Sequence, residues 1–120
     1  MTTGSIPTLV LDFFAAMQGG AASESAMMAL FRDDAVYVEP FSGGVRRHQG
    51  KAAIREVMLA GWQYPLPDMR IVVDAYHATS DGAVADWTCH SPGLPAGKGS
   101  GSSRFTFSDG LIASLETTVR

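Results

Sequence analysis

Two Asp-Gly pairs, Asp81-Gly82 and Asp109-Gly110, each stand between runs of alternating apolar and polar residues. Such a pair is a strong signal for a tight β-hairpin turn, because Asp and Gly tolerate the positive φ angles that these turns require. The flanking runs predict four strands, over 69–79, 83–91, 104–107 and 111–119. The second half of the chain is therefore expected to form an antiparallel meander.

The first half of the chain carries helical periodicity instead. Apolar residues recur every three or four positions between Leu9 and Met17, and Gly19-Gly20 closes that run. A second helix is predicted after the N-cap Ser23, with Met27, Leu30 and Phe31 on one side, and a third from Lys51 to Gly61. A short strand over 35–39 ends at Pro40. Helices followed by a meander predict the α+β class, in one domain spanning 1–120.

Composition excludes several classes of function. Hydrophobic residues make up 46% of the 120 positions and charged residues 18%, so the chain can bury a core. A net charge of -3 argues against nucleic acid as a partner. No run approaches the ~20 apolar residues that cross a membrane, and Met1–Ser5 shows no secretion signal. Cys89 is the single cysteine, and a cytoplasmic location is the default expectation.

Metal and cofactor motifs are absent from the sequence. His48, His77, His90 and Glu39 lack a metal-ligand spacing, so we expect no metal and no cofactor. His48 is interpreted as a loop histidine and His77 as a satisfied core histidine on the face of Ile71 and Val73. The prolines and glycines of 92–97 predict a loop, and 97–101 is expected to be a flexible hairpin, because it does not lead into a helix as phosphate-binding loops do.

Several segments together carry a family resemblance. The stretch Leu30–Pro40, the stretch His48–Arg55, the hairpin Ser80–Ala85 and the stretch Phe105–Ile112 resemble the nuclear transport factor 2-like superfamily. Within it, the chain is most similar to the SnoaL-like polyketide cyclase and ketosteroid isomerase group, from about Leu9 to Val119. The matching positions are mostly core and turn residues, which are diagnostic of fold more than of function.

The resemblance implies a cone-shaped α+β barrel, with three N-terminal helices packed in a strongly curved, mostly antiparallel sheet. It also implies one pocket for a small hydrophobic organic molecule, and a homodimer that pairs through the outer face of the sheet. Members of the superfamily include isomerases, cyclases, hydrolases, dehydratases and non-catalytic binders.

Glu39 is the first candidate catalytic residue. The resemblance places it where the isomerases carry the carboxylate that moves a proton beside a carbonyl. It therefore implies that Glu39 acts as a base. The residues alone leave two alternatives, because Glu39 shares strand parity with Tyr37 and Ala35 and opposes Val36. Either that set faces the pocket, or the valines face the core and Glu39 is solvated.

Asp86 and His90 form a second candidate pair. Period-two geometry places Val84, Asp86, Thr88 and His90 on one face of a strand. The resemblance implies that this face looks inward, where Asp86 could act as a base and His90 as a proton donor. In the reversed register Trp87 is inside, and the polar residues form an ordinary wet face.

Other parts of the isomerase machinery are missing. The first-helix tyrosine of that group falls at Phe13 or Phe14, and its second carboxyl falls near Ser103, so an oxyanion loses donors worth ~3 kcal/mol each. A steroid isomerase is not expected. The segment 61–67 is interpreted as a border or lid. The expected ligand-binding residues are Phe13, Phe14, Met17, Tyr37, Phe41, Trp62, Thr88, Ser103 and Phe105.

Three functional hypotheses follow from these residues. The first is cofactor-free acid–base chemistry of the isomerase or cyclase type on a small, apolar, carbonyl-bearing molecule, in which burial raises the pKa of a catalytic carboxyl. The second is a non-catalytic ligand-binding or dimerisation module of the same fold. The third is a protein-interaction subunit, which predicts a large exposed apolar patch.

Overall fold

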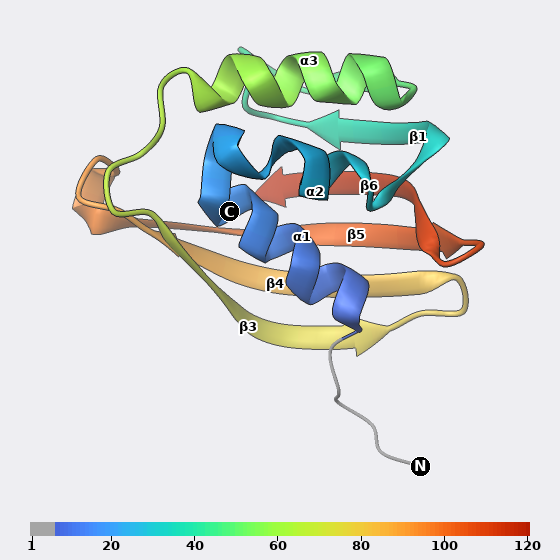
Figure 1. Cartoon of the computed structure of the whole chain (residues 1–120). Coiled ribbons are helices and arrows are strands. Elements are labelled where there is room, and N and C mark those ends of the chain that lie inside the picture. The colour runs from blue at the N-terminus through green and yellow to red at the C-terminus, as the bar shows by residue number, and fades with distance from the viewer. Residues whose placement is uncertain (1–6) are drawn as a thin grey trace.

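The computed structural model describes residues 7–120 and has the predicted helices and strands in the predicted order, with one further strand before the third helix (Figure 1). The segment Met1–Ser5, in which we see no secretion signal, lies outside the described residues. The helices are α1 (Thr8–Gly19), α2 (Glu24–Met28) and α3 (Lys51–Trp62), with short 3-10 helices at Gly20–Ser23 and Pro95–Gly97. The strands are β1 (Phe31–Glu39), β2 (Arg46–Gln49), β3 (Arg70–Ala78), β4 (Gly82–His90), β5 (Lys98–Ser108) and β6 (Leu111–Val119).

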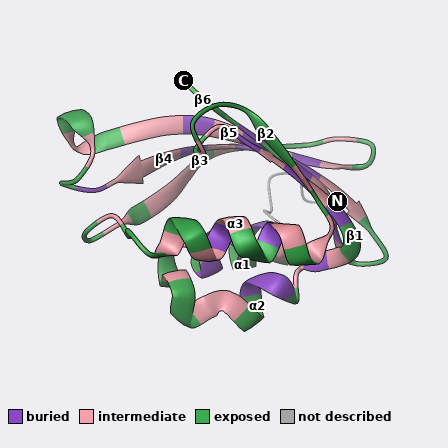
Figure 2. Cartoon of the chain, turned by 90° about the horizontal axis from the view of Figure 1, so that it is seen from above, coloured by how far each residue is buried: buried purple, intermediate pink, exposed green. Residues whose placement is uncertain are grey.

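The strands form a six-stranded sheet in the order β2-β1-β6-β5-β4-β3. The β1–β6 pair is parallel and the other neighbouring pairs are antiparallel. The sheet is curved, and the three helices gather on one side of it (Figure 2). The predicted α+β fold is confirmed. No helix within residues 7–120 has the length and apolar character that a membrane crossing requires.

Local sequence explains why these elements begin and end where they do. In α1, Val10, Phe13 and Phe14 are buried at three- and four-residue spacing, and the helix ends at Gly20 with φ 64°. In α3, Ile54 and Met58 are buried one turn apart. The second hairpin turns at Asp109 and Gly110, whose φ angles of 56° and 76° match the predicted turn.

The structure corrects two of the predicted boundaries and adds one strand. Phe31 begins β1 instead of ending the second helix, and its side chain is fully buried. The segment 98–101 is part of β5 and not a flexible hairpin. A further strand, β2, pairs with β1 where the sequence predicts a loop. Its residues are Arg-Arg-His-Gln, which carry no apolar alternation that a sequence pattern could detect.

A register shift in β3 corrects the placement of His77. Val73 pairs with Trp87, but Ala75 pairs with Asp86, so Asp74 is an extra residue in the ladder. Such a bulge reverses which side chains face inward along the rest of the strand. His77 is consequently exposed instead of lying in the core.

Gly101 allows β5 to pass beneath a tryptophan. A Cβ atom at this position collides with the Trp87 ring and with the Thr118 carbonyl oxygen. Gly99, two residues earlier on the same strand, has open space where its Cβ atom belongs. The glycine-rich start of β5 is therefore a packing requirement at Gly101 and not at Gly99.

We expect Gly101→Ala to lower the free energy of unfolding by about 1–3 kcal/mol, because a methyl group at that position forces Trp87 or the neighbouring strand to move. Gly99→Ala is the matched control and should leave stability almost unchanged. Urea denaturation followed by tryptophan fluorescence measures both variants. Equal midpoints for the two substitutions contradict the proposed contact.

Candidate functional site

The Glu39 side chain lies inside the fold, at the last residue of β1. Its exposed fraction is 1%, and Ala35 and Tyr37, which share its face of the strand, are buried as well. Val36 and Val38 on the opposite face are only partly buried. Of the two alternatives that the sequence left open, the structure has the one in which Glu39 faces the interior.

Three hydrogen-bond donors surround the Glu39 carboxylate. The Phe41 backbone N–H donates to Oε1 at 2.6 Å, and the Ser42 hydroxyl donates to Oε2 at 2.8 Å. The His48 Nε2 atom lies 2.7 Å from the same Oε2 atom. Because an ionised carboxylate only accepts hydrogen bonds, His48 donates from Nε2 and keeps Nδ1 for another partner.

The β1–β2 hairpin brings His48 to this position. Tyr37 and His48 are cross-strand partners, as are Glu39 and Arg46. Directly paired residues of an antiparallel ladder project on the same side of the sheet. His48 is therefore a functional candidate that sequence reasoning missed, since it was interpreted as a loop residue. The Gly43-Gly44 pair between the two strands, with φ angles of 83° and 139°, was the available signal for a hairpin.

The surroundings of Glu39 act on its pKa in opposite directions. Burial of the carboxyl raises its pKa, but the hydrogen bonds from His48, Ser42 and the Phe41 N–H, together with the His48 charge, outweigh burial and lower it. The expectation of a raised pKa is wrong for this residue, because donors replace the lost water. Glu39 stays ionised at neutral pH.

Tyr37 lies beside this pair and stays protonated. Burial raises the pKa of its phenol, the Glu39 charge raises it further, and a hydrogen bond with Thr117 lowers it by less. The centre of its ring lies 6.1 Å from that of the His48 imidazole. Tyr37 is therefore a neutral hydroxyl group next to a carboxylate–histidine pair.

A row of buried polar groups continues from Tyr37 across the concave face. The Trp87 indole N–H donates to the Ser103 hydroxyl at 3.0 Å. Ser103 Oγ lies 3.1 Å from Thr117 Oγ1, and Thr117 is the neighbour of Tyr37. Ser103, predicted as a ligand-binding residue, is thus fully buried, and its hydroxyl is engaged by the protein itself.

Asp86, Thr88 and His90 lie on the other face of the sheet, and the predicted orientation of β4 is wrong. Ala83, Ala85 and Trp87 are the buried residues of this strand. Asp86 accepts a hydrogen bond from Ser102 at 2.8 Å and pairs with Arg120 at 3.2 Å. The Thr88 hydroxyl donates to Asp74 on the same outer face. Trp87 decides the orientation of β4, because its large apolar ring is buried and its indole N–H finds an acceptor on Ser103.

The aromatic residues that the sequence analysis expects to bind a ligand divide into a buried group and an exposed one. Phe13, Phe14 and Phe105 are buried and pack edge-to-face on one another, with ring centres 5.1–6.2 Å apart. Met17 and Trp62 are partly buried against this cluster. Phe41 is 58% exposed, so its predicted place in a pocket wall is wrong in this conformation. The loop after Glu39 has turned its ring away from the core.

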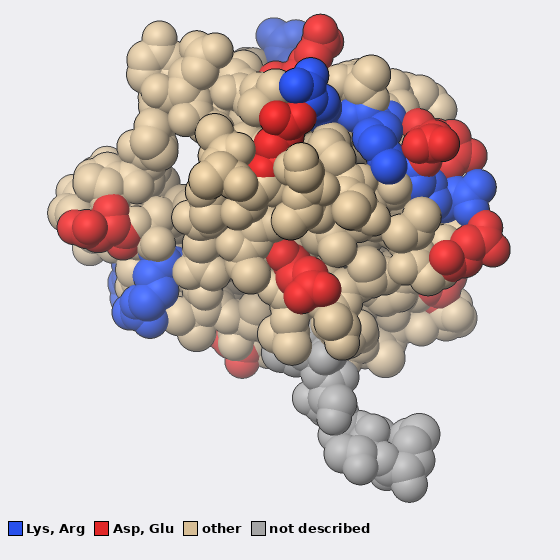
Figure 3. All heavy atoms as spheres, in the orientation of Figure 1, with Lys and Arg blue, Asp and Glu red and all other residues tan. Residues whose placement is uncertain are grey.

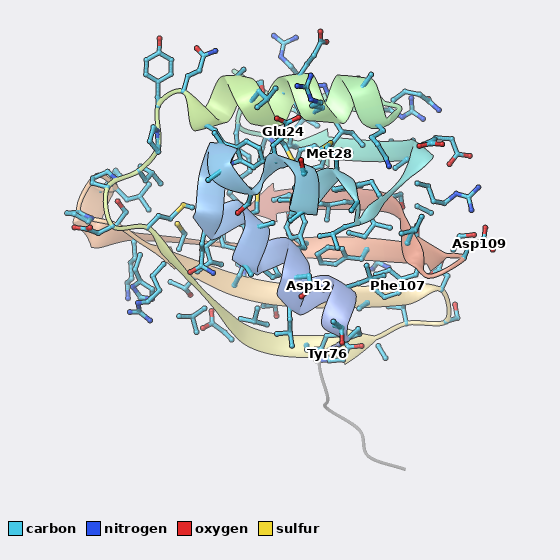
Figure 4. The ribbon with its side chains drawn as sticks, in the orientation of Figure 1. Asp12, Glu24, Met28, Tyr76, Phe107 and Asp109 are labelled. Carbon is cyan, nitrogen blue, oxygen red and sulfur yellow. The ribbon has the colours of Figure 1, made fainter. Side chains whose placement is uncertain are left out.

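Two hollows on the described surface lie away from Glu39. A groove of about 520 Å³ separates α2 from α3 and is lined by Glu24, Met28 and Arg55 among others (Figure 4). A smaller hollow of about 260 Å³ lies between α1 and α2, beside Asp12. Acidic and basic side chains are interspersed near α3 (Figure 3). Neither hollow is lined by a predicted site residue.

Comparison with known families identifies the chain. Residues 10–115 match the SnoaL-like domain family, and the protein belongs to that family. Among solved structures, a candidate polyketide cyclase from Sinorhizobium meliloti is similar to it, with 25% identity and a TM-score of 0.76 over 94% of this chain and 95% of that one.

Two further solved structures share the fold. A candidate ketosteroid isomerase from Kribbella flavida has 19% identity and a TM-score of 0.70, covering 93% of this chain and 75% of that one. A protein with a ketosteroid isomerase-like fold from Catenulispora acidiphila, in complex with trimethylamine, has 18% identity and a TM-score of 0.74 over 95% and 86% of the two chains. No curated protein matches the chain.

Glu39→Gln should destabilise the protein at neutral pH and lose this effect in acid. The folded state lowers the pKa of Glu39. The carboxylate therefore stabilises the fold above its unfolded pKa, and this stabilisation is lost as the pH falls through the folded pKa. Urea denaturation at several pH values measures the difference from wild type. Glu56→Gln, at an exposed position of α3, is the control, and a pH-independent difference for Glu39→Gln contradicts the assignment.

Ser103→Ala should lower the free energy of unfolding by about 1–3 kcal/mol, because the buried Trp87 N–H loses its acceptor. The Trp87 indole proton should also shift in the NMR spectrum. Ser80→Ala removes an exposed hydroxyl and serves as the comparison. A Ser103→Ala variant that is as stable as wild type and has an unshifted indole signal contradicts the hydrogen bond between Trp87 and Ser103.

Proposed function

We propose that this SnoaL-like protein carries out cofactor-free acid–base chemistry, of the isomerase or cyclase type, on a small apolar molecule that bears a carbonyl group. The observation that supports this is the 2.7 Å contact between the buried Glu39 carboxylate and His48 Nε2. A carboxylate that holds one imidazole nitrogen fixes the tautomer of the ring and stabilises the imidazolium formed when the other nitrogen takes a proton.

His48 is the proton carrier in this proposal, and Glu39 orients it. The lowered pKa of Glu39 makes that carboxylate a weak base, whereas histidine is the side chain that most often transfers protons in enzymes. His48 is 18% exposed, so a molecule at the surface can reach it, while Glu39 is closed off. Tyr37 is buried and hydrogen-bonded to Thr117, so its part in the proposal is to pack beside the imidazole and not to contact the bound molecule.

Asp86 and His90 have no part in this mechanism, because the sheet separates them from Glu39. Thr88 lies on their face and is likewise left out. The residues retained from the sequence analysis are Glu39 and Tyr37, with Trp62 and Met17 as partly buried neighbours of the interior. A homodimer formed through the outer sheet face and a cytoplasmic location stay predictions.

The apolar rings of Phe13 and Phe14 favour a second candidate function, a ligand-binding module without catalysis, because they offer an oxyanion no hydrogen-bond donor. Phe13, Phe14 and Phe105 fill the space beneath the sheet with edge-to-face contacts. In that case the residues around Glu39 contribute only to the affinity for the bound molecule. The two functions differ in whether a proton leaves the bound molecule.

Hydrogen–deuterium exchange beside a carbonyl tests the proposal. The protein is incubated in D₂O with simple ketones and diketones, and the loss of α-proton signals is followed by NMR. Replacing His48 by Asn should slow exchange by roughly 100-fold or more, the usual contribution of a general acid–base group. Glu39→Gln should also slow exchange, by misorienting the imidazole.

Asp86→Asn is the control and should keep the wild-type rate, since Asp86 lies on the outer face. An unchanged rate in His48→Asn refutes the assignment of the proton carrier. Binding of a ketone with no exchange above the buffer rate refutes the catalytic proposal and supports the binding module.

A further inference from the structure

Arg46 stands next to the candidate site, on the same side of the hairpin. It is the cross-strand partner of Glu39, and it lies two residues before His48 on β2. Alternate residues of a strand share a face and are about 7 Å apart. The Arg46 side chain therefore emerges beside His48, at the border between the buried pair and solvent.

One hydrogen bond holds the guanidinium group over the loop that covers Glu39. The Arg46 Nε–H donates to the Ser42 carbonyl oxygen at 2.8 Å, while the Ser42 hydroxyl donates to Glu39 at 2.8 Å. Ser42 thus links Arg46 to the carboxylate–histidine pair. Because Nε is fixed to the backbone, the two Nη atoms are presented together in a defined plane.

Within residues 7–120, the Nη atoms of Arg46 have no acidic side chain at ion-pair distance. Arg32, Arg55 and Arg120 each pair with a carboxylate of the chain, whereas Arg47, Arg70 and Arg104, like Arg46, do so with no described residue. Arg46 differs from those three because it is the cross-strand partner of Glu39. The nearest acidic neighbour along the ladder, Glu39, already accepts three hydrogen bonds. Arg46 is therefore a cation whose charge the described part of the fold leaves uncompensated, beside a group that can move a proton.

We propose that the molecule bound at this site carries a carboxylate in addition to its carbonyl, and that Arg46 binds this carboxylate through its two Nη atoms. Paired N–H groups of arginine match the two oxygens of a carboxylate, and such charged hydrogen bonds are among the strong ones in proteins. The inference rests on the proposed proton transfer beside a carbonyl, and it replaces the apolar molecule of that proposal by a small keto acid, which has one charged end. The spacing of Arg46 and His48 suits a molecule whose carbonyl lies a few bonds from its carboxylate.

Levulinate and methyl levulinate form a matched pair of probes, because they share the ketone and differ in the charge of the acid group. Titration of the full chain, followed by NMR, gives the affinity for each probe. Wild type should bind levulinate at least 10-fold more tightly than the ester, and the Arg46 Nε–H signal should shift. Added salt should weaken levulinate binding and leave ester binding unchanged.

Arg46→Gln should remove the preference for the acid, and Arg46→Lys should retain a part of it, because a lysine keeps the charge without the paired N–H groups. Arg47→Gln is the matched control, since Arg47 projects on the opposite face and bonds to Gln49. It should keep the wild-type preference. Equal binding of acid and ester by wild type, a preference that survives in Arg46→Gln, or no binding of levulinate at millimolar concentration overturns the inference.

The same samples separate this inference from the proposed catalysis. Deuterium exchange on both probes reports proton transfer, and the titration reports anchoring. An acid preference that depends on Arg46, without exchange on either probe, supports the anchor and refutes the catalysis. Exchange on the ester at the same rate and affinity as on the acid supports the catalysis and refutes the anchor.

Discussion

The arrangement around the site depends on one buried negative charge. Removing a carboxylate from water is costly unless hydrogen bonds replace the lost solvation. The Glu39 carboxylate obtains them from the Phe41 N–H, the Ser42 hydroxyl and His48. The loop after β1 and the edge strand β2 thus carry the donors that Glu39 requires. β2 has exposed side chains at three of its four positions, so burial of apolar surface does not explain its docking.

The same charge sets the protonation states of its neighbours. An ionised Glu39 assigns the proton of His48 to Nε2, and it disfavours ionisation of the Tyr37 phenol. A single side chain thereby gives the site an acceptor nitrogen, a neutral hydroxyl donor and a carboxylate that does not itself carry protons at neutral pH. Arg46 adds a positive charge at the border, joined to the carboxylate through Ser42. All of these groups belong to the hairpin of β1 and β2, whose strand pairing brings them together.

Predictions from the sequence were correct where they depended on a few adjacent residues. They failed where the pattern fitted two opposite orientations of a strand equally well. The Asp109-Gly110 turn and the helical spacing of Phe13 and Phe14 each depend on a few adjacent residues, and both occur as predicted. In β4, one face carries Asp86 and the other carries Trp87, so alternation alone cannot choose between them. The choice is made by contacts from other strands, namely the space above Gly101 and the acceptor on Ser103.

The sequence by itself determined the α+β class, the two hairpins and the helices, because turn chemistry and apolar periodicity act over short stretches of chain. The family was indicated by the resemblance of several segments to SnoaL-like proteins, and the match over residues 10–115 shows it. Only the tertiary structure decided that His48 meets Glu39 and that Asp86 and His90 face outward. The first outcome depends on the pairing of β2 with β1, and the second on the contacts that Trp87 makes with Gly101 and Ser103 of β5. The bulge at Asp74 likewise decides that His77 is exposed. A one-residue change of register inverts the face of every side chain that follows it, and no local pattern records that change.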